Sequence, residues 1–163
     1  MNTRRRFLGT TALAGIAGLF AASRLGGAKA ETTGTFEVEK TDAEWKAQLS
    51  PEAYRVLRHE GTERPFTSPL NDEHRKGTFT CAGCDLPLFA SETKFDSGTG
   101  WPSFYQPLDK AVIEIDDTSF FMTRTAVNCR RCNGHLGHVF NDGPKPTGLR
   151  YCMNGVAMGF TPA

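Results

Sequence analysis

Two short helices are predicted near the start of the folded part of the chain, where apolar residues recur at helical spacing. Thr41-Asp42 can cap a first helix that runs to about Leu49. Ser50-Pro51 then starts a second helix, with the serine as cap and the proline at the first helical position. The second helix should end at Gly61.

Beyond these helices the apolar residues fall in short runs of β type that are separated by turn residues. The runs cover residues 78–80, 86–90, 111–115, 119–127, 136–140 and 150–159. Clusters such as Asp96-Ser97-Gly98 and Asn141-Asp142-Gly143-Pro144 supply the turns. The chain should therefore fold as a mainly-β or α+β domain, with antiparallel sheets that follow two N-terminal helices.

The first 30 residues have the pattern of a targeting segment. A basic run with the twin-arginine pattern, Thr3–Leu8, precedes an apolar stretch rich in Ala and Gly and a small-x-small site at Ala28-Lys29-Ala30. The apolar stretch, Leu8–Ala22, is shorter than the roughly 20 residues of a membrane-spanning helix. We therefore expect cleavage after Ala30 and a periplasmic or otherwise exported protein, with an uncleaved anchor as the alternative.

Removal of this segment changes the charge of the chain. Lys and Arg number 19 and Asp and Glu 18 in the whole sequence, but the segment holds five basic residues and no acidic one, which leaves a net charge of −4. No basic stripe remains, so we expect no nucleic-acid partner, and we expect no stable membrane association after cleavage. Residues 31–41 should form a flexible lead-in to one domain over residues 42–163, which we expect to be monomeric.

Five cysteines divide into two C-x-x-C pairs and one single residue. The pairs are Cys81-Ala82-Gly83-Cys84 and Cys129-Arg130-Arg131-Cys132. Two such pairs supply the four thiolates of a closed tetrahedral site, so the predicted ligands of one structural Zn²⁺ are Cys81, Cys84, Cys129 and Cys132. Two disulfides, or a thioredoxin-like redox pair, are the alternatives. The twin-arginine route exports folded proteins, so zinc could bind in the reducing cytosol before export.

Cys152 is the sulfur that remains for chemistry once four are assigned to a metal. By base rate, a lone cysteine in an apolar strand is a small buried residue. Its neighbours favour reactivity, because Arg150 and Asn154 each lie two residues away and share its face of a strand. A guanidinium beside a thiol favours the reactive thiolate, and an amide can donate a hydrogen bond to an oxygen of a ligand.

Two histidines and a tryptophan lie in nearby motifs. His135 and His138 are three residues apart, which on a strand directs their side chains to opposite faces. A hydrogen-bonded structural role is one interpretation for each histidine, and proton transfer by at least one of them is the other. Trp101 follows a Gly-rich loop, Asp96–Gly100, and can either pack in the core or form the floor of a pocket for a small apolar group.

Four motifs resemble those of the B-type methionine sulfoxide reductases, which reduce the R epimer of methionine sulfoxide. In chain order they are Tyr54–Phe66, Gly98–Phe104, Gly134–Phe140 and Arg150–Asn154. The resemblance covers about residues 42–160, and several separate motifs in the same order make it specific. It implies two antiparallel sheets with helices at the N-terminal end, and oxidised proteins as the main substrate.

The resemblance also implies roles for single residues. Cys152 matches the family's nucleophile, and Trp101 matches the aromatic residue that receives the methyl group of the sulfoxide. The polar active-site residues of the family match His135, His138, Asp142, Arg150 and Asn154, and its zinc ligands match the four paired cysteines. The implied reaction is thiolate attack on the sulfoxide sulfur while His138, or His135, protonates the oxygen and Asn154 helps to orient it, which leaves Cys152 as a sulfenic acid.

Two positions depart from the family's pattern. Many members carry a resolving cysteine where this chain has Thr99, so apart from the predicted zinc ligands Cys152 has no partner for an intramolecular disulfide. We therefore expect a single-thiol mechanism in which an external thiol or a thioredoxin-like protein reduces the sulfenic acid. Gly155 stands where serine is usual, and the sequence offers no physical account of that change.

Two other functions compete with this interpretation. A non-catalytic zinc-binding scaffold for protein interactions would not need Arg150, Cys152 and Asn154 together with the histidine pair. A Cys-His-Asn hydrolase would need an asparagine that orients a histidine, and the position of Asn154 beside the cysteine gives no sign of that role.

Overall fold

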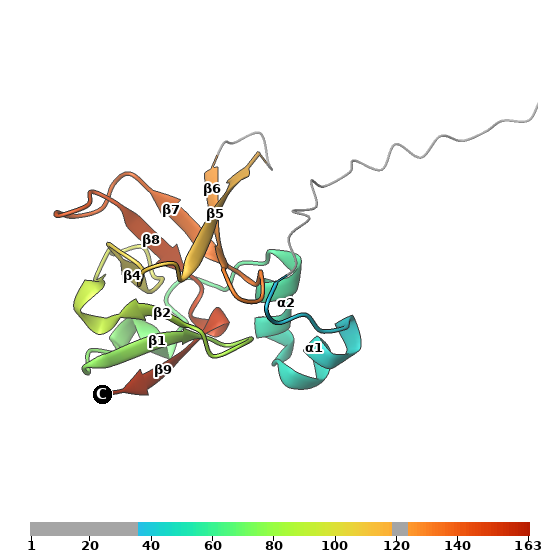
Figure 1. Ribbon diagram of the computed structural model, residues 1–163. Coiled ribbons are helices and arrows are strands. Elements are labelled where there is room, and N and C mark those ends of the chain that lie inside the picture. Colours follow the sequence, from blue (N-terminus) through green and yellow to red (C-terminus); the bar gives the residue numbers. More distant parts are fainter. Residues whose placement is uncertain (1–35, 119–123) are drawn as a thin grey trace, which may run out of the picture. The chain divides into compact units, whose positions relative to one another are not determined.

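The computed structural model describes residues 36–118 and 124–163 (Figure 1). The expected targeting segment and its cleavage site lie outside the described residues, as does part of the strand predicted over residues 119–127. The described end of the expected lead-in contacts the second cysteine pair, because Val38 N–H donates to Arg131 O at 3.0 Å. Glu37 also forms an ion pair with Arg130, with 2.5 Å between Oε1 and Nη1.

The two predicted helices are present, with the expected caps. Helix α1 (Asp42–Gln48) begins with a capping box at Thr41, and helix α2 (Pro51–His59) begins with Ser50, whose hydroxyl accepts a backbone N–H. Helix α2 ends at His59, and its C-cap residue Glu60 has a left-handed conformation with φ of 54°. Within the described residues, no helix is long and apolar enough to cross a membrane.

The strands form two antiparallel sheets, which confirms the predicted mainly-β architecture. The three-stranded sheet has the order β2-β1-β9, and its strands are β1 (Gly77–Cys81), β2 (Pro87–Ala90) and β9 (Met158–Pro162). The six-stranded sheet has the order β3-β4-β8-β7-β6-β5 (Figure 1). Its strands are β3 (Lys94–Phe95), β4 (Ser103–Phe104), β5 (Val112–Asp117), β6 (Arg124–Cys129), β7 (His135–Phe140) and β8 (Arg150–Met153).

The prediction of one strand over residues 150–159 is wrong. A short 3₁₀ helix, Gly155–Ala157, separates β8 from β9, and the two strands lie in different sheets. The apolar run is continuous because both strands face the core, so periodicity alone does not reveal the break. The short strands β3 and β4 were not predicted either.

Three phenylalanines join the two sheets in the core. Phe79 of β1 and Phe89 of β2 belong to the three-stranded sheet, and both contact Phe104 of β4 in the other sheet. The ring centres of Phe89 and Phe104 are 4.3 Å apart and stacked, and those of Phe79 and Phe104 are 4.9 Å apart. This packing fixes β4, which holds one end of the Gly-rich loop.

Candidate functional site

Antiparallel pairing places the single thiol beside a histidine and a serine. Strand β8 pairs with β7 so that Cys152 lies opposite His138, and with β4 so that Cys152 lies opposite Ser103. Directly opposed residues project from the same face of a sheet, with Cβ atoms about 5 Å apart. Cys152 and His138 are both partly exposed, so a ligand in solution can reach the thiol and the imidazole from one side.

Arg150 lies on the same face of β8 as Cys152, and it is fixed on two sides. Its guanidinium donates two hydrogen bonds of 2.8 Å to the Asp142 carboxylate, and its Cζ lies 4.4 Å from the centre of the Phe140 ring. The hydrogen bond to Asp142 raises the pKa of Arg150 against the effect of burial, and the Cys152 thiolate raises it further. Arg150 in turn holds the pKa of Asp142 below its usual value.

The two histidines share one region, contrary to the expectation that they face opposite sides. Their ring centres are 5.2 Å apart. The cause is a register shift in the pairing of β6 with β7, between Val127 and Asn128, which interrupts the regular alternation at the start of β7. His138 Nε2 lies 3.0 Å from the Asp117 carboxylate, and His135 Nδ1 lies 3.2 Å from Asn128 Oδ1.

His135 is held in its neutral form. Burial, and secondarily the nearby His138, lower the pKa of His135 from 6.5 to about 4. Its Nε2 atom is buried and has no hydrogen-bond partner among the described residues. A buried imidazole without a partner for its second nitrogen resists protonation, which makes His135 the weaker candidate for a proton donor at neutral pH.

This burial predicts a pH dependence of stability. Between pH 6.5 and about 4 the unfolded chain binds a proton at residue 135 and the folded chain does not. The contribution of neutral His135 to the free energy of unfolding is therefore complete above pH 6.5 and is lost as the pH falls towards 4. His135→Gln should therefore flatten the acid side of the profile, by on the order of 2 kcal/mol near pH 4. Urea unfolding from pH 4 to 8 measures this effect, and the exposed His74→Gln is the control. Equal slopes for His135→Gln and wild type would contradict it.

Asn154 does not continue the strand, although its spacing from Cys152 suggested that it would. Strand β8 ends at Met153, and Asn154 is the N-terminal cap residue of the 3₁₀ helix η4 (Gly155–Ala157). Its Nδ2 donates to Leu136 O at 3.0 Å, and its Oδ1 accepts the Glu63 N–H at 2.9 Å. The amide oxygen is thus bound to a backbone N–H and not to a histidine, which argues against the Cys-His-Asn hydrolase.

The loop between β3 and β4 brings Thr99 to the thiol. Thr99 Oγ1 lies 3.7 Å from Cys152 Sγ, which is within hydrogen-bonding distance for sulfur. Gly98 and Gly100 on either side have φ of 69° and 89°, a region that glycine adopts without a steric penalty. Trp101 follows directly in the loop and is partly exposed.

The structure adds residues that the sequence analysis did not select. Ser97 Oγ lies 2.8 Å from both Thr99 Oγ1 and Ser103 Oγ, so a row of hydroxyls leads to the thiol. The contact of Asp117 with His138 had no sequence signal, because it arises through the pairing of three strands. Glu63 is buried, and it lies within the Tyr54–Phe66 motif, which is the sequence signal that could have identified it.

The four paired cysteines form one cluster, as predicted. Their Sγ atoms all lie within 4.8 Å of one another, with 3.7 Å between Cys81 and Cys132 and 3.5 Å between Cys84 and Cys129. Four sulfurs around a tetrahedral metal at the usual Zn–S distance of about 2.3 Å would be about 3.8 Å apart. The cluster could therefore hold a metal ion with little movement. All five cysteines are free of disulfides, and Cys152 is not part of the cluster.

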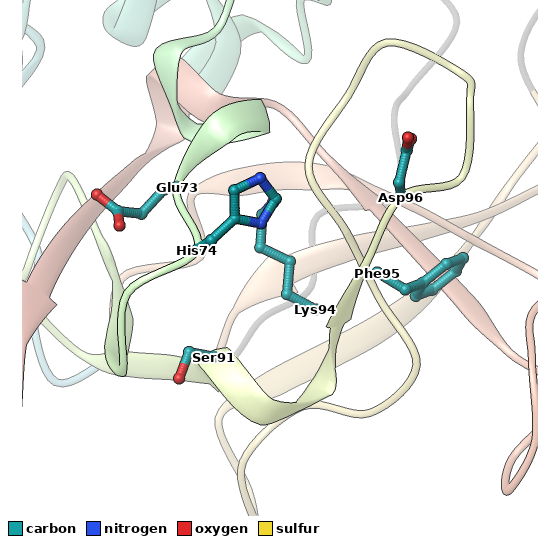
Figure 2. Close-up of a pocket in the computed structure, with 6 residues that line it drawn as sticks. All are labelled: Glu73, His74, Ser91, Lys94, Phe95 and Asp96. Carbon is teal, nitrogen blue, oxygen red and sulfur yellow. The ribbon is translucent and has the colours of Figure 1, made fainter.

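A surface cavity of about 250 Å³ lies beside the start of the Gly-rich loop and contains none of the predicted site residues. Figure 2 shows the side chains that line it, which are Glu73, His74, Ser91, Lys94, Phe95 and Asp96. A neighbouring cavity of about 220 Å³ reaches Trp101. Cys152 lines neither of these two cavities, and its side chain is partly exposed.

Comparison with known proteins gives a consistent result. The chain matches the SelR domain family over residues 49–162, a range that includes every predicted site residue. A protein of Pseudomonas putida named peptide methionine sulfoxide reductase MsrB is 61% identical over 127 residues, which cover 77% of this chain and 96% of that protein. Proteins of the same name from Thiobacillus denitrificans and Leptospira interrogans are 60% and 54% identical, over 94% and 96% of their lengths and 76% and 77% of this chain.

Proposed function

The chain belongs to the SelR domain family, and we propose that it reduces the R epimer of methionine sulfoxide, mainly in oxidised proteins. Its curated relatives are named peptide methionine sulfoxide reductases, which supports methionine sulfoxide reduction in general. The observation that carries the proposal is the pairing of Cys152 with His138 on one open face of the sheet, beside Arg150. A nucleophile, an acid and a fixed cation are the groups that this reduction needs.

The reaction begins with attack of the Cys152 thiolate on the sulfoxide sulfur. His138 donates a proton to the sulfoxide oxygen, because a sulfoxide becomes electrophilic when its oxygen is protonated. The attack joins Cys152 Sγ to the sulfoxide sulfur. This S–S bond then breaks as the protonated oxygen is transferred to Sγ, so methionine leaves with its sulfur reduced by two electrons and Cys152 becomes a sulfenic acid. Two thiols of an external reductant then return Cys152 to the thiol and release water and a disulfide.

His138 is the proposed acid because it lies opposite Cys152 and faces the thiol side of the sheet. His138→Gln should lower the single-turnover rate of methionine release by about 10²–10⁴-fold, the usual contribution of a general acid. His135→Gln should have the smaller effect, since burial keeps that imidazole neutral. Rapid-quench measurement of methionine formation compares the two variants. Equal rates for His138→Gln and wild type would remove His138 from the mechanism.

Thr99 is the reason to propose a single-thiol cycle. It occupies the position of the family's resolving cysteine, and its Oγ1 lies 3.7 Å from Cys152 Sγ. Thr99→Cys should therefore create a disulfide with Cys152 after one turnover without reductant, seen as the loss of two hydrogens in the intact mass. Wild type should gain one oxygen in the same experiment. Absence of the disulfide in Thr99→Cys would show that the loop does not hold residue 99 at the thiol.

We assign zinc to the cysteine cluster. Four thiolates in tetrahedral arrangement favour Zn²⁺, and a site closed by four protein ligands is structural. When bound, the metal would join the turn after β1 to the turn after β6 and would leave Cys152 as the reactive sulfur. Metal analysis of the purified protein should find one zinc per chain.

We also propose that the protein is exported through its twin-arginine segment and is cleaved after Ala30, which accords with the pattern of the first 30 residues. N-terminal sequencing of the protein from the periplasm tests this proposal, and Glu31 is the expected first residue.

An assay on separated epimers tests the activity itself. With dithiothreitol as reductant, the purified protein should consume the R epimer of a methionine sulfoxide peptide and leave the S epimer unchanged. Consumption of neither epimer by zinc-loaded protein would favour the non-catalytic scaffold instead.

A further inference from the structure

Glu63 is a buried acidic residue outside the proposed reaction, and its carboxylate joins two separate segments. Its side chain is 6% exposed. Oε1 accepts the Gly155 N–H at 2.5 Å, and Oε2 accepts the Val156 N–H at 3.1 Å. These two N–H groups belong to η4, which begins directly after its cap residue Asn154. The carboxylate thus binds the short helix that follows β8, the strand that carries Cys152.

The backbone of the same residue binds two groups of the site. The Glu63 N–H donates to Asn154 Oδ1 at 2.9 Å. The Glu63 carbonyl oxygen accepts the Trp101 Nε1–H at 3.3 Å. One residue therefore contacts both the Trp101 indole and the Asn154 amide, which lie 38 and 91 residues from it in the sequence.

We propose that Glu63 is a positioning residue that sets the Trp101 indole and the Asn154 amide relative to the Cys152 thiol. The inference rests on the proposed function, because it assigns these groups to the binding and orientation of methionine sulfoxide. Glu63 acts through Trp101 and Asn154 and makes no contact with the thiol itself in the described structure.

The carboxylate matters because the backbone contacts of Glu63 with Asn154 and Trp101 require the segment after α2 to stay in place. The bonds from the carboxylate to the Gly155 and Val156 N–H groups attach this segment to η4. Burial raises the pKa of Glu63, and the two backbone N–H bonds oppose that shift, so the bonds offset part of the cost of burying the carboxyl group. A carboxylate retained under these conditions is consistent with a positional role.

Gly155 allows this close approach. A Cβ atom at this position would collide with the hydroxyl of Ser68 and lie 3.4 Å from Glu63 Oε1. Ser68 is itself buried, and its hydroxyl accepts the Leu70 N–H at 3.2 Å. Ser68 thus fills the space that a serine side chain at position 155 would need, which gives a physical reason for the glycine.

Two substitutions of Glu63 and one control test the inference. Glu63→Gln keeps the shape, but its amide can accept one N–H and presents its own NH₂ group to the other. Glu63→Ala removes both acceptors. Glu92→Gln changes an exposed residue of the short helix η2 (Ser91–Thr93) and removes one negative charge away from the site. Zinc content and thermal unfolding of each variant establish that the protein is folded.

The kinetic expectation separates positioning from stability. Glu63→Gln should lower kcat/KM by about tenfold and Glu63→Ala by about 100-fold, as expected when reacting groups are misplaced by a fraction of an ångström to 1 Å. KM should rise, because Trp101 no longer receives the methyl group, and kcat should fall, because Asn154 is no longer fixed. A purely structural role would lower the folded fraction and apparent kcat without a change in KM. Wild-type KM and kcat in the folded Glu63 variants would overturn the inference. If Glu63→Ala does not fold, the kinetic constants of Glu63→Gln alone test it.

Fluorescence of Trp101 provides a readout that is independent of activity. The chain has two tryptophans, Trp45 and Trp101, so Trp45→Phe isolates the signal of Trp101. In this background, acrylamide should quench Trp101 more strongly in both Glu63 variants than in Glu92→Gln. Unchanged quenching overturns the inference even where activity falls. If wild type reduces no sulfoxide, the proposed function fails, and quenching alone decides whether Glu63 positions the indole.

Discussion

Cys152→Ser is expected to lose methionine sulfoxide reduction by about 10⁴-fold or more, because a serine hydroxyl is a far weaker nucleophile than a thiolate and cannot form the sulfenic acid. No other thiol can replace it, since the remaining four cysteines lie together in the cluster. The measurement is the initial rate of methionine formation from the R sulfoxide with saturating dithiothreitol.

The same variant should keep the fold. Cys152 is partly exposed and outside the cluster, so its replacement by the smaller hydroxyl removes no metal ligand. Zinc content and melting temperature should therefore equal those of wild type. Residual turnover near the wild-type rate in pure Cys152→Ser would mean that another group attacks the sulfoxide.

Cys129→Ser is expected to cause the largest loss of stability. Structural zinc sites contribute about 10–16 kcal/mol of apparent binding free energy at pH 7, which is comparable with the 5–15 kcal/mol stability of a typical domain. Cys129 is fully buried at the end of β6, so the serine hydroxyl cannot escape to solvent, and the other three sulfurs lose a closed site.

Metal analysis and near-ultraviolet circular dichroism check this prediction. Cys129→Ser should be purified with far less than one zinc per chain and with reduced fixed aromatic packing. Cys152→Ser is the matched control, because it also exchanges one sulfur for oxygen but leaves the cluster intact. A Cys129→Ser protein that melts at the wild-type temperature would show that the cluster does not stabilise the fold.

Local signals predicted the helices and the cysteine cluster, which could hold a metal ion. The caps at Thr41 and Ser50 form hydrogen bonds only to residues within the first turn of their helices, so the local sequence is enough to identify the helix starts. The spacing of the paired cysteines likewise fixes two sulfurs per turn, and the structure brings the two turns together.

Long-range pairing decided what the sequence could not predict. The shift at Val127 brings His135 towards His138, and a simple count of alternating positions gives the opposite result. The break of the strand after Met153 depends on η4 packing against the loop at Glu63, which lies 92 residues from Gly155 in the chain. Neither feature has a local sequence signature.

In the proposed mechanism, one cysteine is free to be oxidised while the other four hold a metal. Its most direct test is the reaction of zinc-loaded protein with excess R sulfoxide in the absence of any external thiol. We expect one methionine released per chain, one oxygen added to the intact mass, labelling of Cys152 by a sulfenic-acid reagent, and no loss of zinc. A disulfide between Cys152 and a cluster cysteine, with release of zinc, would contradict it.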